Sequence, residues 1–294
     1  MPETEEVKEV GLVETLCAFN KAVLFDPTDE AFEDALNAFL KSNAEQWAHK
    51  PELWMTDFVS PCLRRMVWKI TKPEIVDPPP PTDLRKIFDA GKAIHDWHQN
   101  EYYGPMGILW GRWKCSICKN VVEGFRPKEP CPGVVTLGLT GVCSCKILGA
   151  RWKYEEPRVE YKAYGITAAG RTDGILYGQS TDPSSEILEM KSKDSDLWAK
   201  LTKAEHGHVF QGSIYATMLG VKQVKIVYIE KNKWRLKVYQ HQPIPDAMNT
   251  VDKIMKQVAE LMTESGPSRA PKVCASKSAS RARRCGARSL CFEK

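Results

Sequence analysis

Two acidic side chains and a lysine are spaced so that one β-hairpin could bring them together. Asp173 lies in the stretch 170–178, and Glu189 and Lys191 lie in the stretch 186–193. Both stretches alternate apolar and polar residues, which predicts strands, and the Gly-, Ser-, Asp- and Pro-rich residues between them predict a turn. Folding about the middle of that turn places Asp173 almost opposite Glu189, with Glu189 and Lys191 on one face.

This trio has two interpretations. Two carboxylates and an ammonium group are costly to bury together unless a divalent cation joins them. Carboxylate oxygens suit Mg²⁺ or Mn²⁺, and a lysine beside such an ion could orient or help deprotonate an attacking water. The alternative is a solvated hairpin with an incidental ion pair, and the three residues alone do not choose between the two.

Helices and a second hairpin are predicted around these strands. Apolar residues at helical spacing predict helices over residues 5–48, 60–70, 82–103, 195–219 and 244–264. Ser60 is the candidate N-cap of the second of these, with Pro61 at its first position, and Gly220 is a candidate C′ glycine. The second hairpin turns at residues 231–233.

Size and composition indicate a globular protein. The 294 residues suffice for one large domain or two modest ones, and 43% are hydrophobic and 27% charged. No apolar run approaches a membrane span, and the acidic start lacks the order of a signal peptide, so we expect a cytoplasmic protein with no membrane partner. From Arg269 onward there are eight Lys or Arg and one Glu, a tail that suits either a polyanion or plain solvation.

Half of the ten cysteines gather in one Gly- and Pro-rich insertion. Cysteines in a chain without a secretion signal favour metal sites or reduced thiols over disulfides. The five in the insertion are Cys115, Cys118, Cys131, Cys143 and Cys145. Four thiolates in a core-poor loop are typical of structural Zn²⁺, with the first three as ligands and Cys143 or Cys145 as the fourth. Free thiols in a loop are the alternative.

A second cysteine group lies in the basic tail. Cys274, Cys285 and Cys291 have almost no apolar neighbours with which to form a core, so a ligand role explains them better than packing. Cys62 is the natural fourth ligand, and it would tie the N-terminal region to the C-terminus. Cys₄ ligation fits either Zn²⁺ or an iron–sulfur cluster.

Four further polar residues lie on predicted helices. His95 could be a ligand or a structural residue, and His98 competes with it for any role. Gln211 and Tyr215 are four residues apart and share a helix face. They could hydrogen-bond phosphates or bases, or they could belong to a partly buried helix.

Taken in order, these motifs resemble the RecB-like branch of the PD-(D/E)XK nuclease superfamily. Within that branch the similarity is to iron–sulfur exonucleases of the AddB and CRISPR-adaptation types and their phage relatives. The motifs are the cysteine in PCLRRMVW, GKAIH, GRTDGI, EMK at 189–191, QGSIY and the three terminal cysteines. They cover roughly residues 58–294, interrupted by the insertion at 115–145.

The resemblance implies a fold and an active site. The fold would be mixed α/β, with a central mixed sheet flanked by helices, a restriction-endonuclease-like core and the Cys-rich zinc-binding insertion. His95, Asp173 and Glu189 would bind Mg²⁺ or Mn²⁺, with the main-chain carbonyl of Met190 as a further ligand. Lys191 would position or activate the water.

It also implies roles outside the catalytic residues. Gln211 and Tyr215 would hold the DNA strand, and a [4Fe–4S] cluster would be bound by Cys62, Cys274, Cys285 and Cys291. One departure is that ten residues separate Cys274 from Cys285, more than in the family. The implied domains are an N-terminal helical region (1–57), the nuclease core (58–265, insertion 113–150) and the tail (266–294).

The predicted function is divalent-metal-dependent DNA cleavage, as an exonuclease on single-stranded or end-processed DNA. Its partners would be DNA and recombination or replication proteins. The alternative is a non-catalytic nucleic-acid-binding subunit of a recombination or repair complex, whose metal sites are structural. A zinc-ribbon interaction protein would account for the insertion but not for EMK, GKAIH and QGSIY.

Overall fold

A computed structural model describes most of the chain beyond residue 49. The described residues are 34, 37–38, 50–76, 79–136, 142–283 and 285–292. The chain divides into two units, Met1–Ala48 with Pro79–Arg85, and His49–Pro78 with Lys86–Lys294. The helices predicted over residues 5–48 lie almost wholly outside the described residues. Apart from residues 79–85, everything below concerns the second unit. The predicted core and tail domains stay predictions.

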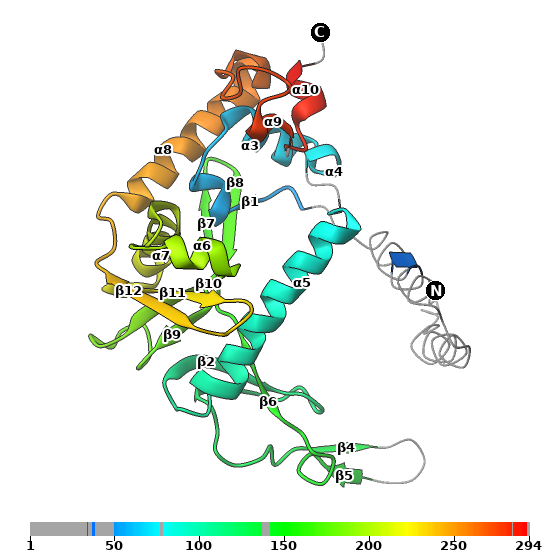
Figure 1. Cartoon of the computed structure of the whole chain (residues 1–294), viewed down its shortest axis with the longest axis vertical. Helices are drawn as coiled ribbons and strands as arrows, with labels where there is room; N and C mark the ends of the chain where they lie inside the picture. Colours follow the sequence, from blue (N-terminus) through cyan, green and yellow to red (C-terminus); the bar gives the residue numbers. More distant parts are fainter. Residues whose placement is uncertain are drawn as a thin grey trace, which may run out of the picture. The chain divides into compact units, whose positions relative to one another are not determined.

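Within the described ranges, seven strands form the central sheet (Figure 1). They are β2 (Leu109–Cys115), β3 (Val121–Phe125), β6 (Trp152–Glu155), β9 (Gly174–Leu176), β10 (Glu186–Lys193), β11 (Gln223–Glu230) and β12 (Leu236–His241). The order is β12-β11-β10-β9-β2-β3, with β6 also paired to β2. Among the described strand pairs of this sheet, β10–β11 alone is parallel, so the sheet is mixed, as predicted.

Two smaller sheets accompany it. One joins β1 (Leu53–Trp54), β8 (Ile166–Arg171) and β7 (Arg158–Ala163), and the other pairs β4 (Val134–Thr136) with β5 (Val142–Ser144) inside the insertion. The chain passes directly from β8 to β9, so it leaves the β1–β8–β7 sheet and enters the central sheet within two residues.

Helices cover the sheets. They are α3 (Leu63–Thr71), α4 (Pro73–Val76), α5 (Thr82–Trp97), α6 (Ser195–Lys200), α7 (His206–Leu219), α8 (Ala247–Glu260), α9 (Ser280–Arg283) and α10 (Arg288–Phe292). Short turns of other helix types are η1 (Met55–Phe58), η2 (His98–Tyr103), η3 (Leu261–Ser265) and η4 (Pro267–Arg269). In the described part of the chain, none of these helices combines the length and the apolar run needed to span a bilayer.

The main core lies between α7 and the central sheet. Ile214 and Tyr215 of α7 pack with Val224, Ile226 and Tyr228 of β11 in one buried apolar cluster. Such burial explains why α7 contains no Asp, Glu, Lys or Arg. Gly220 ends the helix in the left-handed conformation, with φ of 72°, as the predicted C′ glycine.

Two predicted helix boundaries are wrong. The helix predicted over 195–219 is split into α6 and α7, because Lys237 of β12 donates to the carbonyl oxygens of Trp198 and Leu201 and ends the first helix there. The predicted N-cap Ser60 is also wrong, since α3 begins at Leu63 with Cys62 as N-cap. The Ser60 carbonyl instead accepts a hydrogen bond from Arg281 of the tail.

A buried ion network holds α3 against η1. Asp57, only 9% exposed, accepts hydrogen bonds from the Trp54 backbone N–H at 2.8 Å, from the Lys69 ammonium at 2.8 Å and from Arg65. Burial acts to raise the pKa of Asp57, but the charges of Lys69 and Arg65 outweigh it and hold that pKa below its usual value.

Asp57→Asn should therefore lower the free energy of unfolding by about 3 kcal/mol, because it removes the carboxylate charge that pairs with the buried Lys69 ammonium. The pKa of Asp57 is depressed in the folded state, so its contribution is complete above the unfolded-state pKa of about 3.9 and is lost as the pH falls through the folded-state pKa. Denaturant unfolding at pH 7 and at lower pH measures both effects. Asp196→Asn, at an exposed position, is the control. Equal loss in the two variants would contradict this assignment.

Candidate active site and metal centres

Asp173 lies in the short connection between strands β8 and β9. The strand predicted over 170–178 is interrupted, because β8 ends at Arg171 and β9 begins at Gly174. Since Gly174 pairs with Leu188 in the antiparallel β9–β10 ladder, Asp173 comes opposite Glu189, as the sequence predicted. The Asp173 Oδ2 atom accepts the Met190 backbone N–H at 2.5 Å. The carboxylate is thereby fixed above β10.

Helix α5 and the residue after β6 add two more ligand groups. The Nδ1 atom of His95 lies 3.2 Å from Oδ1 of Asp173. One ligand atom each from His95, Glu156 and Asp173 lies within 4.8 Å of the others, so these three could hold a metal ion. Gln99 fixes the arrangement, because its amide donates to Glu156 Oε1 at 3.1 Å and to the Asp173 carbonyl at 2.8 Å.

Sequence reasoning missed Glu156 and Gln99. Glu156 stands among other acidic residues in the stretch 154–160, and no spacing in that stretch distinguishes it. Gln99 is four residues after His95 and therefore close to the same helix face, which is the one signal the sequence offered.

Glu189 and Lys191 lie beside this group. Glu189 is 1% exposed, and its Oε1 atom pairs with the Lys191 ammonium. Its Oε2 atom is buried and has no hydrogen-bond partner among the described residues. Glu189 itself falls outside the group of three, so its predicted role as a metal ligand stays a prediction. An unpartnered buried carboxylate oxygen is nonetheless what a hard cation would satisfy.

The pKa values of Glu189 and Asp173 are shifted in opposite directions. Burial raises the pKa of Glu189 to about 7, against the pull of Lys191. Burial also acts to raise the pKa of Asp173, but the hydrogen bond and charge of His95 and the charge of Lys191 leave it below its usual value. Burial acts to lower the pKa of Lys191, and the Glu189 and Asp173 charges more than reverse this, so Lys191 is an ammonium donor.

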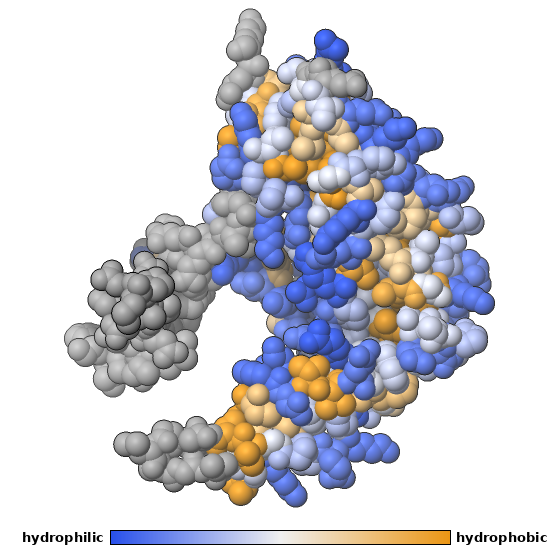
Figure 2. Space-filling view, turned by 180° about the vertical axis from the view of Figure 1, so that it is seen from behind, coloured by the Kyte–Doolittle hydropathy of each residue, from blue (hydrophilic) through white to orange (hydrophobic). Residues whose placement is uncertain are grey.

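His95, Asp173 and Lys191 line a cavity of about 1110 Å³. Its other basic residues are Lys92, Arg126, Arg151, Lys153, Arg171 and Lys231. Hydrophilic side chains are prominent across the middle of the face shown in Figure 2. A cavity with cations around an acidic, ligand-bearing wall can bind a phosphate chain and a divalent ion together.

Gln211 and Tyr215 are close to the acids but do not line that cavity. Both side chains are buried in α7, where the Gln211 amide donates to the Tyr215 hydroxyl at 3.2 Å. Burial, and then the charge of Glu189, raise the pKa of Tyr215. Their predicted contact with DNA stays a prediction.

The insertion brings four cysteines together. The sulfur atoms of Cys115, Cys118, Cys131 and Cys145 all lie within 4.8 Å of one another, and those of Cys118 and Cys131 are 3.5 Å apart. Tetrahedral Zn²⁺ with bonds of about 2.3 Å would place its sulfurs about 3.8 Å apart. The group could therefore hold a metal ion, with Cys145 as the fourth ligand. The side chain of Cys143 lies outside the described residues.

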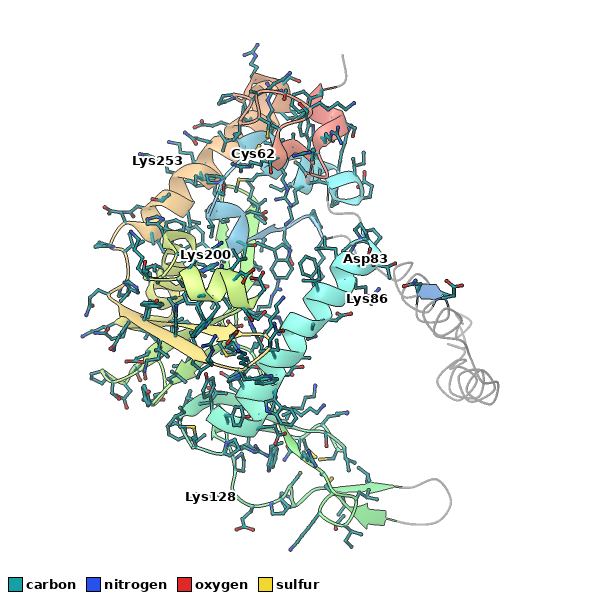
Figure 3. The ribbon with its side chains drawn as sticks, in the orientation of Figure 1. Cys62, Asp83, Lys86, Lys128, Lys200 and Lys253 are labelled. Atoms are coloured by element: carbon teal, nitrogen blue, oxygen red, sulfur yellow. The ribbon has the colours of Figure 1, made fainter. Side chains whose placement is uncertain are left out.

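The terminal cysteines are arranged differently. Cys62, Cys274, Cys285 and Cys291 line one cavity of about 600 Å³. Figure 3 shows Cys62 beside the C-terminal segment, and Ala287, Cys285 and Cys291 pack against Trp68 and Val76 there. Among the described residues, no three of these cysteines bring their sulfurs within 4.8 Å of one another. The terminal cysteines therefore do not form a compact sulfur group like the one in the insertion.

Glu156→Gln should weaken Mn²⁺ binding by about tenfold or more, because it removes a charged oxygen from the group formed by His95, Glu156 and Asp173. Isothermal titration calorimetry of the purified chain measures the affinity. Glu155→Gln is a matched control, since the adjacent Glu155 pairs instead with Arg112 and Lys114. Equal Mn²⁺ affinity in the two variants would remove Glu156 from the site.

No family model matches this sequence, and no curated protein matches it. Solved structures with similarity include SSO0001, at 16% identity and a TM-score of 0.42 over 82% of this chain and 90% of that one. An alkaline exonuclease (LHK-Exo) from Laribacter hongkongensis is 9% identical, with a TM-score of 0.42 over 74% of this chain and 94% of that one. The same enzyme in complex with dAMP gives a TM-score of 0.41 at 9% identity. These scores establish neither a family nor an activity.

Proposed function

We propose that this chain is a Mg²⁺- or Mn²⁺-dependent nuclease that hydrolyses DNA phosphodiester bonds. The observation that carries the proposal is the convergence of His95, Glu156 and Asp173 within 4.8 Å, beside the Glu189–Lys191 pair. A surface ion pair would require neither the histidine nor the unpartnered oxygen of Glu189. The basic residues around the cavity supply the complement to a phosphate chain.

The residues present fit a hard divalent cation. His95, Glu156 and Asp173 would hold it, with Glu189 and the Met190 carbonyl as the further ligands that the family resemblance implies. The ion, when bound, acidifies water and neutralises charge on the phosphate. Lys191 is a hydrogen-bond donor that orients the attacking water and a phosphate oxygen. Gln99 holds Glu156 and the backbone of Asp173 in place.

The finer features of the proposal rest on the family resemblance and on the two cysteine groups. We propose exonuclease action on single-stranded or end-processed DNA, in the cytoplasm, with recombination or replication proteins as partners. The insertion would bind structural Zn²⁺ and the terminal cysteines a [4Fe–4S] cluster. Metal analysis and visible absorbance of protein purified without oxygen test these two assignments.

A cleavage assay on end-labelled DNA tests the activity. Linear and circular substrates, single- and double-stranded, are incubated with Mg²⁺, with Mn²⁺ or with a chelator. We expect metal-dependent release of short products from linear DNA and little cleavage of circles. Tight DNA binding without cleavage under any of these conditions would contradict the proposal and favour a non-catalytic binding subunit.

A further inference from the structure

Two exposed tryptophans meet beside the metal-ligating residues. Trp97 follows His95 by two residues in α5 and lines the same cavity. Trp234 lies between β11 and β12, on a turn that comes close to α5 (Figure 1). Their ring centroids are 6.4 Å apart at an interplanar angle of 77°. Trp97 is 50% exposed and Trp234 is 42% exposed, so neither ring is packed away in the core.

The fold holds Trp234 in this place. Its φ of 57° is in the left-handed region, which bulky residues rarely adopt, so the surrounding structure must enforce it. Its backbone N–H donates to the Glu230 carbonyl at 2.9 Å and closes the turn. The ring of buried His98 lies almost parallel to that of Trp234, with centroids 5.5 Å apart and an angle of 15°. His98 therefore packs against one face of the Trp234 ring.

Basic side chains accompany the pair. Lys231 lines the cavity and belongs to the same turn as Trp234, and Lys92 lines the cavity from α5, five residues before Trp97. Lys233 is exposed directly beside Trp234. Aromatic rings interleaved with cations are the combination that binds unpaired nucleic acid, because bases stack on the rings while phosphates meet the cations.

We propose that Trp97 and Trp234 form a stacking platform for the unpaired bases of a DNA strand whose backbone enters the metal-binding cavity. This rests on the proposed nuclease function and narrows its substrate to single-stranded DNA or duplex ends with an unpaired overhang. Bases inside a duplex already stack on one another, so the platform would not accept them without unpairing. An apolar peptide segment could also contact two tryptophans, but it would not match the lysines.

Binding measurements separate the platform from the chemistry. Every variant is made in full-length protein carrying Glu189→Gln, and anisotropy of a fluorescent oligothymidylate gives its affinity without turnover. Trp97→Ala and Trp234→Ala should each weaken binding about tenfold. Trp234→Phe should retain most of the affinity, because it keeps a ring. Tyr164→Ala, which removes another aromatic side chain of similar exposure from the β7–β8 turn, should have no effect.

An abasic oligonucleotide of equal length and charge is the decisive probe. It should bind the parent protein about as weakly as oligothymidylate binds Trp234→Ala, and the tryptophan substitutions should not weaken it further. Equal losses on both oligonucleotides, or no loss on either, would overturn the platform. Cleavage by the unsubstituted chain is measured separately. If the chain cleaves DNA but its binding does not depend on the bases, only the stacking platform is refuted. If binding depends on the bases but no cleavage occurs, only the nuclease function is refuted.

Discussion

Replacing Glu189 with glutamine or Lys191 with alanine should reduce DNA cleavage by about a thousandfold or more. Glutamine keeps the size of Glu189 but removes the charge that its buried Oε2 atom would offer to a cation. Alanine at 191 removes the ammonium that pairs with Glu189 and faces the cavity. Both groups act where charge develops during phosphoryl transfer, so each loss should appear mainly in the rate of the chemical step.

Single-turnover cleavage of end-labelled linear DNA measures this effect, alongside thermal unfolding to show that the variants fold. Lys193→Ala is the matched control. Lys193 lies two residues further along β10, but its ammonium pairs with Glu205. The control should cleave at close to the unsubstituted rate. Unimpaired cleavage by purified Glu189→Gln or Lys191→Ala protein would eliminate the proposed roles of these residues.

Cys118→Ser or Cys145→Ser should release the metal from the insertion and unfold it. Cys115, Cys131 and Cys145 are buried with Trp113 and Trp152 in an apolar cluster that extends into the central sheet. Structural zinc contributes on the order of 10 kcal/mol or more to such modules.

Elemental analysis should show about one equivalent of zinc fewer in each variant, and limited proteolysis should cut selectively within residues 115–145. Cys143→Ser is the matched control, because Cys145 supplies the fourth sulfur of the group that the structure describes. The control should keep its zinc. Full zinc content in Cys118→Ser protein, or loss of zinc from Cys143→Ser protein, would contradict the assignment.

We expect the cysteine group of the insertion to have a structural role and the residues at the cavity to have the catalytic one. The cysteines of the insertion are mostly buried and share their cluster with apolar residues of the central sheet, such as Leu188 and Met190. Strand β10 also contains Glu189 and Lys191, and Lys191 lines the cavity. Loss of the insertion should therefore reduce cleavage indirectly, by loosening the strand, and not by removing a catalytic group.

Local patterns in the sequence determined much of the fold and part of the site. Alternation of apolar and polar residues predicted β10 and the β11–β12 hairpin, and the turn between 178 and 185 predicted the register that sets Asp173 opposite Glu189. Cysteine spacing predicted three of the four sulfurs in the insertion. These features depend on neighbours a few residues away, which a sequence displays directly.

The contacts between residues far apart in the sequence could be seen only in the tertiary structure. Gln99 reaches Glu156 and Asp173 across 57 and 74 residues, and Lys237 ends α6 from 36 residues away. The rings of Trp97 and Trp234 contact each other although the two residues are far apart in the sequence. Such contacts arise from the packing of α5 and the strands around β10, where side-chain shape and burial act over distances that no local periodicity records.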